Sequence, residues 1–217
     1  MSGPPPVESV HPMTVDGLAL EGELALTADG DREPRAVAVV CHPHPLYGGS
    51  MHNNVVGRLF LDLPGRGVPT LRFNFRGAGG SAGSHDGGDA ERSDVVAAID
   101  VAAERYPGRP LLLGGYSFGA DVALAVGDDR IGGWLAVSPP LRIVAPEAMV
   151  AATDARPTMI VSGSADDFRT AADAGALTAS WPATDVRTAD GVDHFWMRGL
   201  DQVTAAADDL LDRIAPT

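Results

Sequence analysis

Short, largely apolar runs alternate along the chain with longer segments in which apolar side chains recur at helical spacing. A continuous apolar run is typical of a strand that is buried on both faces of a sheet, and the longer repeat is typical of an amphipathic helix. The pattern predicts strands at residues 37–41, 69–75, 110–115, 133–137, 158–161 and 183–188, and helices at residues 51–64, 90–106, 120–126, 171–181 and 200–214.

This alternation predicts an α/β fold with a mostly parallel central sheet and helices on both of its faces. Asp16-Gly17 is expected to form a hairpin turn between two further strands. The connection between residues 137 and 158 is too short for a large lid domain. We therefore expect a single domain at residues 7–217, preceded by a disordered N-terminal tail at residues 1–6.

Composition and charge restrict the classes of function. The net charge of −13 at pH 7 argues against a basic surface for nucleic-acid phosphates, so no nucleic acid is expected as a partner. No run of about 18 apolar residues is present for a membrane span, and no signal peptide is recognised. We therefore expect a cytoplasmic protein without a membrane partner. The abundance of Ala, Gly, Asp and Arg is typical of a bacterial sequence of high GC content.

Ser117 lies at the centre of the pentapeptide GYSFG at residues 115–119, directly after the apolar run at 110–113. This is the G-x-S-x-G pattern of a nucleophile elbow, in which serine occupies a sharp turn between a strand and a helix. The glycines on either side avoid Cβ atoms where strand and helix approach closely. The first N–H groups of the following helix point toward the oxygen of the group that the serine attacks. Ser117 is therefore the candidate nucleophile.

Further motifs occur in order between residues 36 and 196. They are HPHP at 42–45 with Gly48-Gly49 and Asn53-Asn54, RFNFRG at 72–77, the elbow at 115–119, GSAD at 163–166 and DHF at 193–195. With these motifs the chain resembles the small, lidless bacterial α/β-hydrolases of the dienelactone-hydrolase and serine-esterase type. The resemblance implies the α/β-hydrolase fold and the order Ser, Asp, His for the catalytic residues.

The resemblance places a catalytic acid and a base after the elbow. His194 is the only histidine that follows Ser117, and it comes just after the last predicted strand. Asp166 follows the strand at 158–161, where the family places its acid, and its neighbour Asp167 is the alternative. A serine hydroxyl needs such a base, and the base needs a carboxylate that orients it. The expected catalytic residues are Ser117, Asp166 and His194.

An oxyanion hole requires two backbone N–H donors aimed at the developing negative charge. Phe118, the residue after the nucleophile, is expected to supply one of them. The second is expected from the loop at the end of the first parallel strand, where Pro43 replaces the glycine of the family's H-G-x-P pattern and has no N–H. The donor is then the backbone of His44, with Leu46 or Tyr47 as the alternative.

Other kinds of site fit the sequence less well. Prolines separate the three neighbouring histidines, and no carboxylate or cysteine stands at helical spacing to them, so we expect no metal ion and no cofactor. These histidines are His42, His44 and His52. The glycine-rich segment at 77–84 lacks the spacing of a phosphate- or dinucleotide-binding loop and is expected to form a rim of the active site. Arg72 and Arg76 are expected to form structural ion pairs.

The expected function is that of an esterase-type serine hydrolase, in which Ser117 attacks a small-molecule ester or thioester and water releases the acyl group. Tyr47 and Trp196 are expected to line the substrate pocket. The same catalytic residues would serve lactone opening, acyl transfer or C–C cleavage, and a catalytically silent binding module is a further alternative. The apolar side of the helix at 200–214 either covers the sheet or forms part of a homodimer face.

Overall fold

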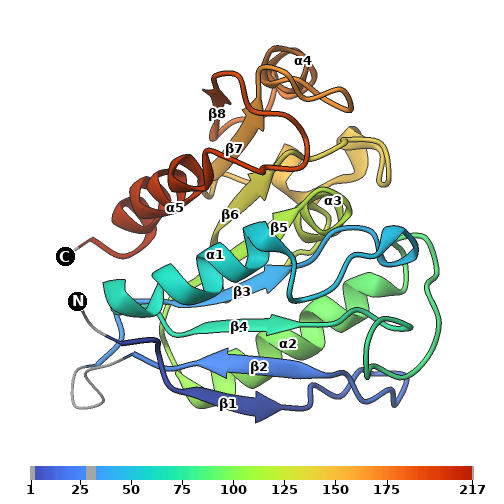
Figure 1. Cartoon of the computed structure of the whole chain (residues 1–217), viewed down its shortest axis with the longest axis vertical. Coiled ribbons are helices and arrows are strands. Elements are labelled where there is room, and N and C mark those ends of the chain that lie inside the picture. The colour runs from blue at the N-terminus through green and yellow to red at the C-terminus, as the bar shows by residue number, and fades with distance from the viewer. Residues whose placement is uncertain (1–2, 28–32, 217) are drawn as a thin grey trace.

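The computed structural model describes residues 3–27 and 33–216. Within these residues eight strands form one sheet: β1 (Val7–Val10), β2 (Gly22–Ala25), β3 (Val37–Cys41), β4 (Thr70–Phe73), β5 (Leu111–Tyr116), β6 (Ile131–Val137), β7 (Thr158–Gly163) and β8 (Thr184–Ala189). Their order across the sheet is β1-β2-β4-β3-β5-β6-β7-β8 (Figure 1). β2 pairs in an antiparallel way with β1 and β4, and all other neighbours are parallel.

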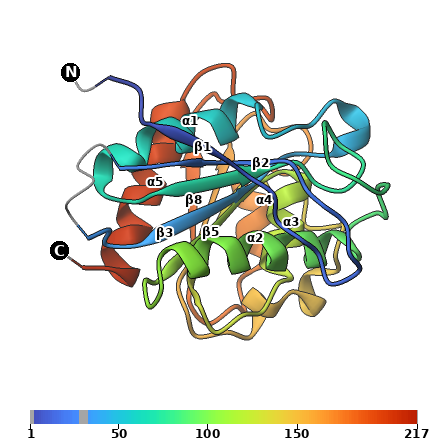
Figure 2. The same cartoon turned by 90° about the horizontal axis from the view of Figure 1, so that it is seen from below.

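In the described part of the chain five α-helices cover the sheet: α1 (Asn54–Asp62), α2 (Glu91–Arg105), α3 (Phe118–Leu124), α4 (Ala171–Leu177) and α5 (Leu200–Ile214). Figures 1 and 2 show α1 and α5 on one face and α2, α3 and α4 on the other. The predicted α/β fold is therefore confirmed. The β6-to-β7 connection contains two short 3-10 turns and holds no lid domain. None of the described helices is long and apolar enough to cross a membrane.

The apolar run of β3 explains how the sheet is buried on both faces. Val37, Val39 and Cys41 belong to the core beneath α2 and α3, whereas Ala38 and Val40 belong to the core beneath α1 and α5. A strand places successive side chains on opposite faces, so an uninterrupted apolar run contributes to both cores.

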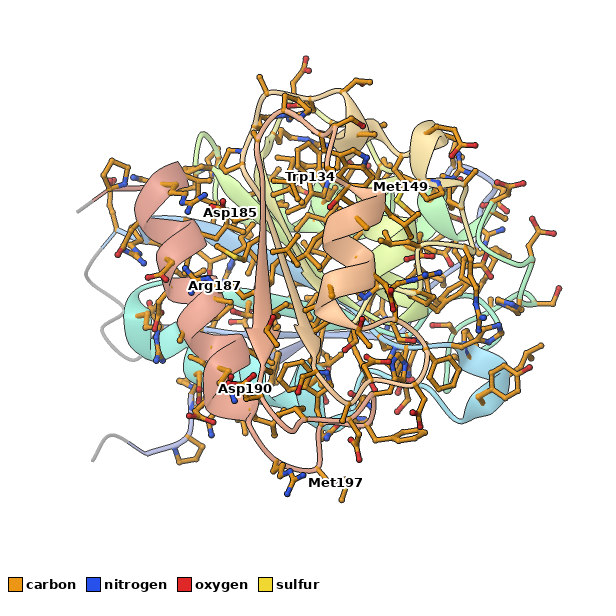
Figure 3. All side chains as sticks on the ribbon, turned by 90° about the horizontal axis from the view of Figure 1, so that it is seen from above. Trp134, Met149, Asp185, Arg187, Asp190 and Met197 are labelled. Atoms are coloured by element: carbon orange, nitrogen blue, oxygen red, sulfur yellow. The ribbon has the colours of Figure 1, made fainter. Side chains whose placement is uncertain are left out.

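The apolar side of the C-terminal helix α5 covers the sheet, which is one of the two alternatives expected from the sequence. Val203, Leu210 and Leu211 of α5 are fully buried in the core that this helix shares with α1. On its outer side α5 lies beside β8, and Figure 3 shows Asp185 and Arg187 there. Two ion pairs join these elements, Arg187–Asp209 and Asp185–Arg213.

Every predicted parallel strand and helix has a counterpart, but some ends differ for local reasons. α1 begins at Asn54 rather than at residue 51, because the Asn53 side chain accepts a hydrogen bond from the Val55 N–H and caps the helix. α3 begins at Phe118, two residues before the predicted start, because Ser117 itself occupies the N-cap position. The side-chain cap of Asn53 and the turn at Ser117 thus decide where these two helices begin.

The N-terminal hairpin is wider than a tight two-residue turn would make it. Gly17 has φ 80°, as the Asp-Gly turn predicts. Near the turn the arms are joined by a Met13–Ala19 bridge and by hydrogen bonds from the Thr14 N–H to the Leu18 carbonyl oxygen and from the Leu20 N–H to the Pro12 carbonyl oxygen. The ladder between β1 and β2 forms farther from the turn. Of the tail expected at the N-terminus, residues 1 and 2 lie outside the described residues, and residues 3–6 form neither helix nor strand.

Arg72 and Arg76 form the ion pairs expected of them. Arg72 Nη2 lies 2.6 Å from Glu23 Oε2, which ties β4 to β2. Arg76 Nη2 lies 2.7 Å from Asp94 Oδ1 on α2, and Asp94 is fully buried. Hydrogen bonds with Asp94 raise the pKa of the Arg76 guanidinium, which stays charged. This second pair fastens the carboxyl end of β4 to α2.

Candidate active site

The nucleophile elbow lies where β5 ends and α3 begins, beside the carboxyl end of β3. Ser117 has φ 53° and ψ −121°, a strained conformation that costs about 1–3 kcal/mol in a residue other than glycine. A Cβ atom on Gly115 would lie 2.3 Å from the carbonyl oxygen of Gly119, and one on Gly119 would lie 2.4 Å from that of His42. Close backbone approach therefore requires both glycines of the pentapeptide.

A hydrogen-bonded relay joins Ser117, His194 and Asp166, which follow β5, β8 and β7. Ser117 Oγ lies 3.0 Å from His194 Nε2, and His194 Nδ1 lies 2.9 Å from Asp166 Oδ2. A carboxylate at Nδ1 selects the tautomer that carries its proton there, so Nε2 is free to accept the serine proton. The Tyr116 hydroxyl donates to the His194 carbonyl oxygen at 2.5 Å and holds this loop against β5.

The carboxylate of the relay is that of Asp166. It is buried, and its Oδ1 accepts hydrogen bonds from the N–H groups of Phe168 and Arg169 at 2.9 Å and 3.1 Å. Burial alone would raise the pKa of Asp166, but hydrogen bonds from His194 and the Arg169 N–H outweigh it and hold this pKa below its usual value. The alternative acid, Asp167, is exposed and takes no part in these contacts. The structure thus brings together Ser117, His194 and Asp166.

The loop after β3 carries a candidate amide donor, the N–H of His44, to the cavity at the nucleophile. The N–H groups of His44 and Phe118 donate no hydrogen bond within the described part of the chain, and both residues line the cavity at Ser117. The two alternative amides are engaged in the turn at Pro45–Tyr47. The Tyr47 N–H donates to the His44 carbonyl oxygen at 3.1 Å, and the Leu46 N–H donates to His44 Nδ1 at 3.3 Å. His44 and Phe118 are the free donors.

A buried carboxylate that no sequence motif indicates also shapes the site. Asp121 lies in the first turn of α3, and its two oxygens accept hydrogen bonds from three consecutive N–H groups of residues 141–143, each at 2.9 Å. Burial raises the pKa of the Asp121 carboxyl to about 6, against the opposing effect of these hydrogen bonds. Asp121 thereby fastens the loop after β6 to the helix that follows the nucleophile. An acidic residue in a first helical turn is too common to signal such a contact.

We expect Asp121→Asn to lower the free energy of unfolding by about 2 kcal/mol, because the new amide turns a donor toward backbone N–H groups that need an acceptor. Urea unfolding followed by circular dichroism measures the change. Asp201 is an exposed acid in the first turn of α5, and Asp201→Asn is a matched control with an expected effect within about 0.5 kcal/mol. Equal losses in the two variants would contradict the anchoring role of Asp121.

A cavity of about 530 Å³ opens at the relay. Its apolar lining is largely aromatic and comes from several segments of the chain: Tyr47, Tyr116, Phe118, Phe168 and Phe195. Tyr47 is one of the residues that line it. Trp196 does not line it, which corrects the expectation for this residue. Trp196 is fully buried under α1 and α5, and its Nε1–H donates to Ser138 Oγ at 2.9 Å. A positive φ of 52° at Trp196 accompanies this inward turn, while its neighbour Phe195 stays exposed.

The first histidine of the HPHP motif has a structural role. Its Nδ1 lies 2.6 Å from the Pro43 carbonyl oxygen, and its Nε2 accepts a hydrogen bond from the Phe75 N–H at 3.0 Å. Burial lowers the pKa of His42 to about 4, so the ring is neutral. Both nitrogens are thus occupied, and within residues 3–27 and 33–216 no group of three or more His, Cys, Asp or Glu could hold a metal ion.

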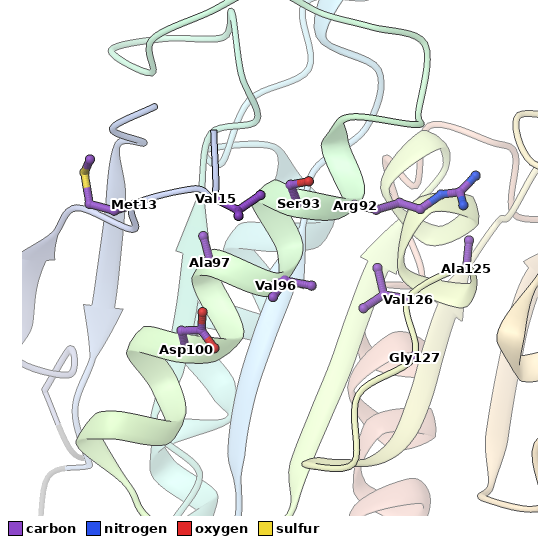
Figure 4. Close-up of a pocket in the computed structure, with 10 residues that line it drawn as sticks. All are labelled: Met13, Val15, Arg92, Ser93, Val96, Ala97, Asp100, Ala125, Val126 and Gly127. Carbon is purple, nitrogen blue, oxygen red and sulfur yellow. The ribbon is translucent and has the colours of Figure 1, made fainter. Parts of the chain in front are cut away.

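A second cavity of similar size lies away from the relay, between the N-terminal hairpin, α2 and the end of α3 (Figure 4). Its volume is about 560 Å³. Ser93 and Asp100 contribute oxygen atoms to its wall, but the lining contains no histidine or cysteine. Without a base beside the Ser93 hydroxyl, this cavity lacks the means to activate a nucleophile. The chemistry of the lining, and not the volume, distinguishes the two cavities.

The sequence of this chain is similar to those of known proteins. The family model described as serine aminopeptidase, S33, matches residues 32–156. An uncharacterised protein of Rickettsia prowazekii is 35% identical over 185 residues, which cover 81% of this chain and 78% of that protein.

Two solved structures are similar over nearly their whole length. The first is an α/β serine hydrolase without a lid from Xanthomonas campestris, with a TM-score of 0.82, 27% identity and coverage of 100% of this chain and 99% of that chain. The second is an α/β serine hydrolase homologue from Coxiella burnetii, with a TM-score of 0.80, 28% identity and coverage of 96% and 97%.

Proposed function

Because the chain belongs to the serine aminopeptidase S33 family of α/β serine hydrolases, we propose that it hydrolyses a carboxylic ester or thioester of a small molecule. In this proposal Ser117 is the nucleophile, His194 is the general base and acid, and Asp166 orients the imidazole. The observation that supports it is the relay from Ser117 Oγ through His194 to Asp166, at 3.0 Å and 2.9 Å.

The first chemical step follows from these distances. Ser117 Oγ attacks the carbonyl carbon while His194 Nε2 takes the hydroxyl proton, and the Asp166 carboxylate stabilises the imidazolium that forms. The carbonyl oxygen becomes negative in the tetrahedral intermediate and accepts hydrogen bonds from the N–H groups of Phe118 and His44. The intermediate collapses when the C–O or C–S bond of the substrate breaks and His194 returns the proton to the leaving group.

The second step repeats this chemistry with water. His194 Nε2 takes a proton from a water molecule, whose oxygen attacks the acyl carbon bound to Ser117. The acid product leaves when the bond to Ser117 Oγ breaks and the imidazolium reprotonates this oxygen. The same acyl-enzyme would pass its acyl group to an alcohol or amine in a transferase, so product analysis separates hydrolysis from acyl transfer.

The lining of the cavity favours ester hydrolysis over aminopeptidase activity. An aminopeptidase must hold the positive α-amino group of its substrate, for which a carboxylate is the matching partner. The lining contains no Asp or Glu side chain, and its charged residue is Arg142. The shallow setting, without a lid, suits small substrates.

Labelling with a fluorophosphonate probe, followed by intact mass, tests the nucleophile. The wild type should gain the mass of one adduct, because Ser117 Oγ is activated by His194 and attacks phosphorus as it attacks a carbonyl carbon. Ser117→Ala should gain none, whereas Ser9→Ala, which changes an exposed serine of the outer strand β1, should label as the wild type does. A folded wild type that gains no adduct would overturn the proposal.

A further inference from the structure

The arginines of the chain are almost all neutralised by carboxylates. Among the described residues, all but three form an ion pair with Asp or Glu. Two of the three exceptions donate to backbone carbonyl oxygens instead, Arg169 to Pro140 and Arg198 to Gly191. The guanidinium of Arg142 has neither kind of partner within the described part of the chain. It is the exception that needs an explanation.

Arg142 lies in the wall of the cavity that holds Ser117 and His194. The chain has a net charge of −13, yet the lining of this cavity contains one cation and no carboxylate. A cationic wall in an acidic protein attracts anions and repels cations at short range. The cavity is therefore matched in charge to an anionic substrate.

Two contacts hold Arg142 in place. The buried Asp121 carboxylate accepts its N–H at 2.9 Å and fixes the backbone at this position. The guanidinium carbon lies 5.7 Å from the centroid of the Phe168 ring, and that ring lies 4.3 Å from the imidazole of His194. The Phe168 ring is thus close to both the guanidinium and the catalytic base. Because Arg142 and Ser117 line one cavity, a substrate group that pairs with Arg142 belongs to the molecule whose carbonyl carbon reaches Ser117.

We propose that the substrate is an ester or thioester that also bears a carboxylate, and that this carboxylate pairs with the Arg142 guanidinium. The inference rests on the proposed function. The planar guanidinium presents parallel N–H donors that match the two oxygens of a carboxylate. Arg142 is then a binding residue that determines which substrates are preferred, separate from the groups that make and break bonds.

Two pairs of substrates test the proposal, each pair differing only in charge. For a carboxylate on the acyl side, the 4-nitrophenyl monoester of adipic acid is compared with its terminal amide. For a carboxylate on the alcohol side, 4-acetoxybenzoate is compared with 4-acetoxybenzamide. We expect Arg142→Gln to lower the carboxylate-to-amide ratio of kcat/KM roughly fivefold in one of the pairs. Arg142→Lys should retain part of the preference, and 0.5 M salt should weaken it in the wild type.

Arg105→Gln is the matched control, because it removes the same charge from an exposed arginine that pairs with Glu8 on the outer strand β1. Its ratio should equal that of the wild type. A ratio that Arg142→Gln leaves unchanged in both pairs, in an enzyme that still reacts with the fluorophosphonate, would overturn this inference and leave the proposed function standing. A wild type that neither reacts with the probe nor hydrolyses any of the four esters would overturn both.

Discussion

Asp166→Asn is expected to lower kcat about 10⁴-fold while the protein stays folded. Asp166 Oδ2 accepts a hydrogen bond from the Nδ1–H of His194, with the two atoms 2.9 Å apart. Asparagine removes the negative charge and can place its NH2 group, a donor, against Nδ1. The imidazole would then favour the wrong tautomer, and its protonated form would lose its counter-charge. Steady-state kinetics with 4-nitrophenyl acetate measure the change, and far-ultraviolet circular dichroism reports the fold.

Asp167→Asn is the control for this result. It removes the same charge one residue away, from an exposed side chain outside the relay, so its kcat should stay close to that of the wild type. The asparagine oxygen at position 166 can still accept the Phe168 and Arg169 N–H groups, which preserves the loop. Equal and mild reductions in the two variants would show that Asp166 does not act as the acid.

Arg76→Met is expected to lower the free energy of unfolding by about 3–5 kcal/mol, the largest effect on stability that we predict. Asp94 is fully buried and receives hydrogen bonds from Arg76 Nε at 2.9 Å and Nη2 at 2.7 Å. Methionine fills much of the same volume but leaves the Asp94 carboxylate without its counter-charge in the interior. Urea unfolding, with the slope fitted for each variant, measures the loss.

Arg105→Met is the control for Arg76→Met, because Arg105 forms an exposed pair with Glu8. Such pairs contribute about 0–1 kcal/mol, so this variant should unfold near the wild-type midpoint. The double variant Arg76→Met with Asp94→Leu should recover part of the loss, since it removes the unpaired charge as well. An Arg76→Met protein as stable as the wild type would contradict the role of this buried pair.

The order of elements could be predicted from the sequence because each depends on neighbours along the chain. The apolar run of β3 faces two cores, and in an α/β fold such a run is typical of a strand that is buried on both faces of the sheet. The elbow was equally visible, because the backbone contacts of Gly115 and Gly119 exclude any Cβ atom. Local backbone geometry and the spacing of apolar residues are thus sufficient to predict the fold class and the position of Ser117.

Other features depend on segments that are distant in the chain and meet only after folding. Asp121 and Arg142 lie in different segments, and only the packing of α3 against the loop after β6 joins them. Trp196 is adjacent to the exposed Phe195, yet one positive φ turns its ring into the core.

The sequence by itself determined the α/β architecture. It also indicated the candidate nucleophile Ser117, the candidate base His194 and the two candidate acids. The tertiary structure decided which acid faces the imidazole, which amides stay free and which arginine is left without a carboxylate. The directions of these side chains depend on contacts between segments that are distant in the chain, and no local pattern encodes those contacts.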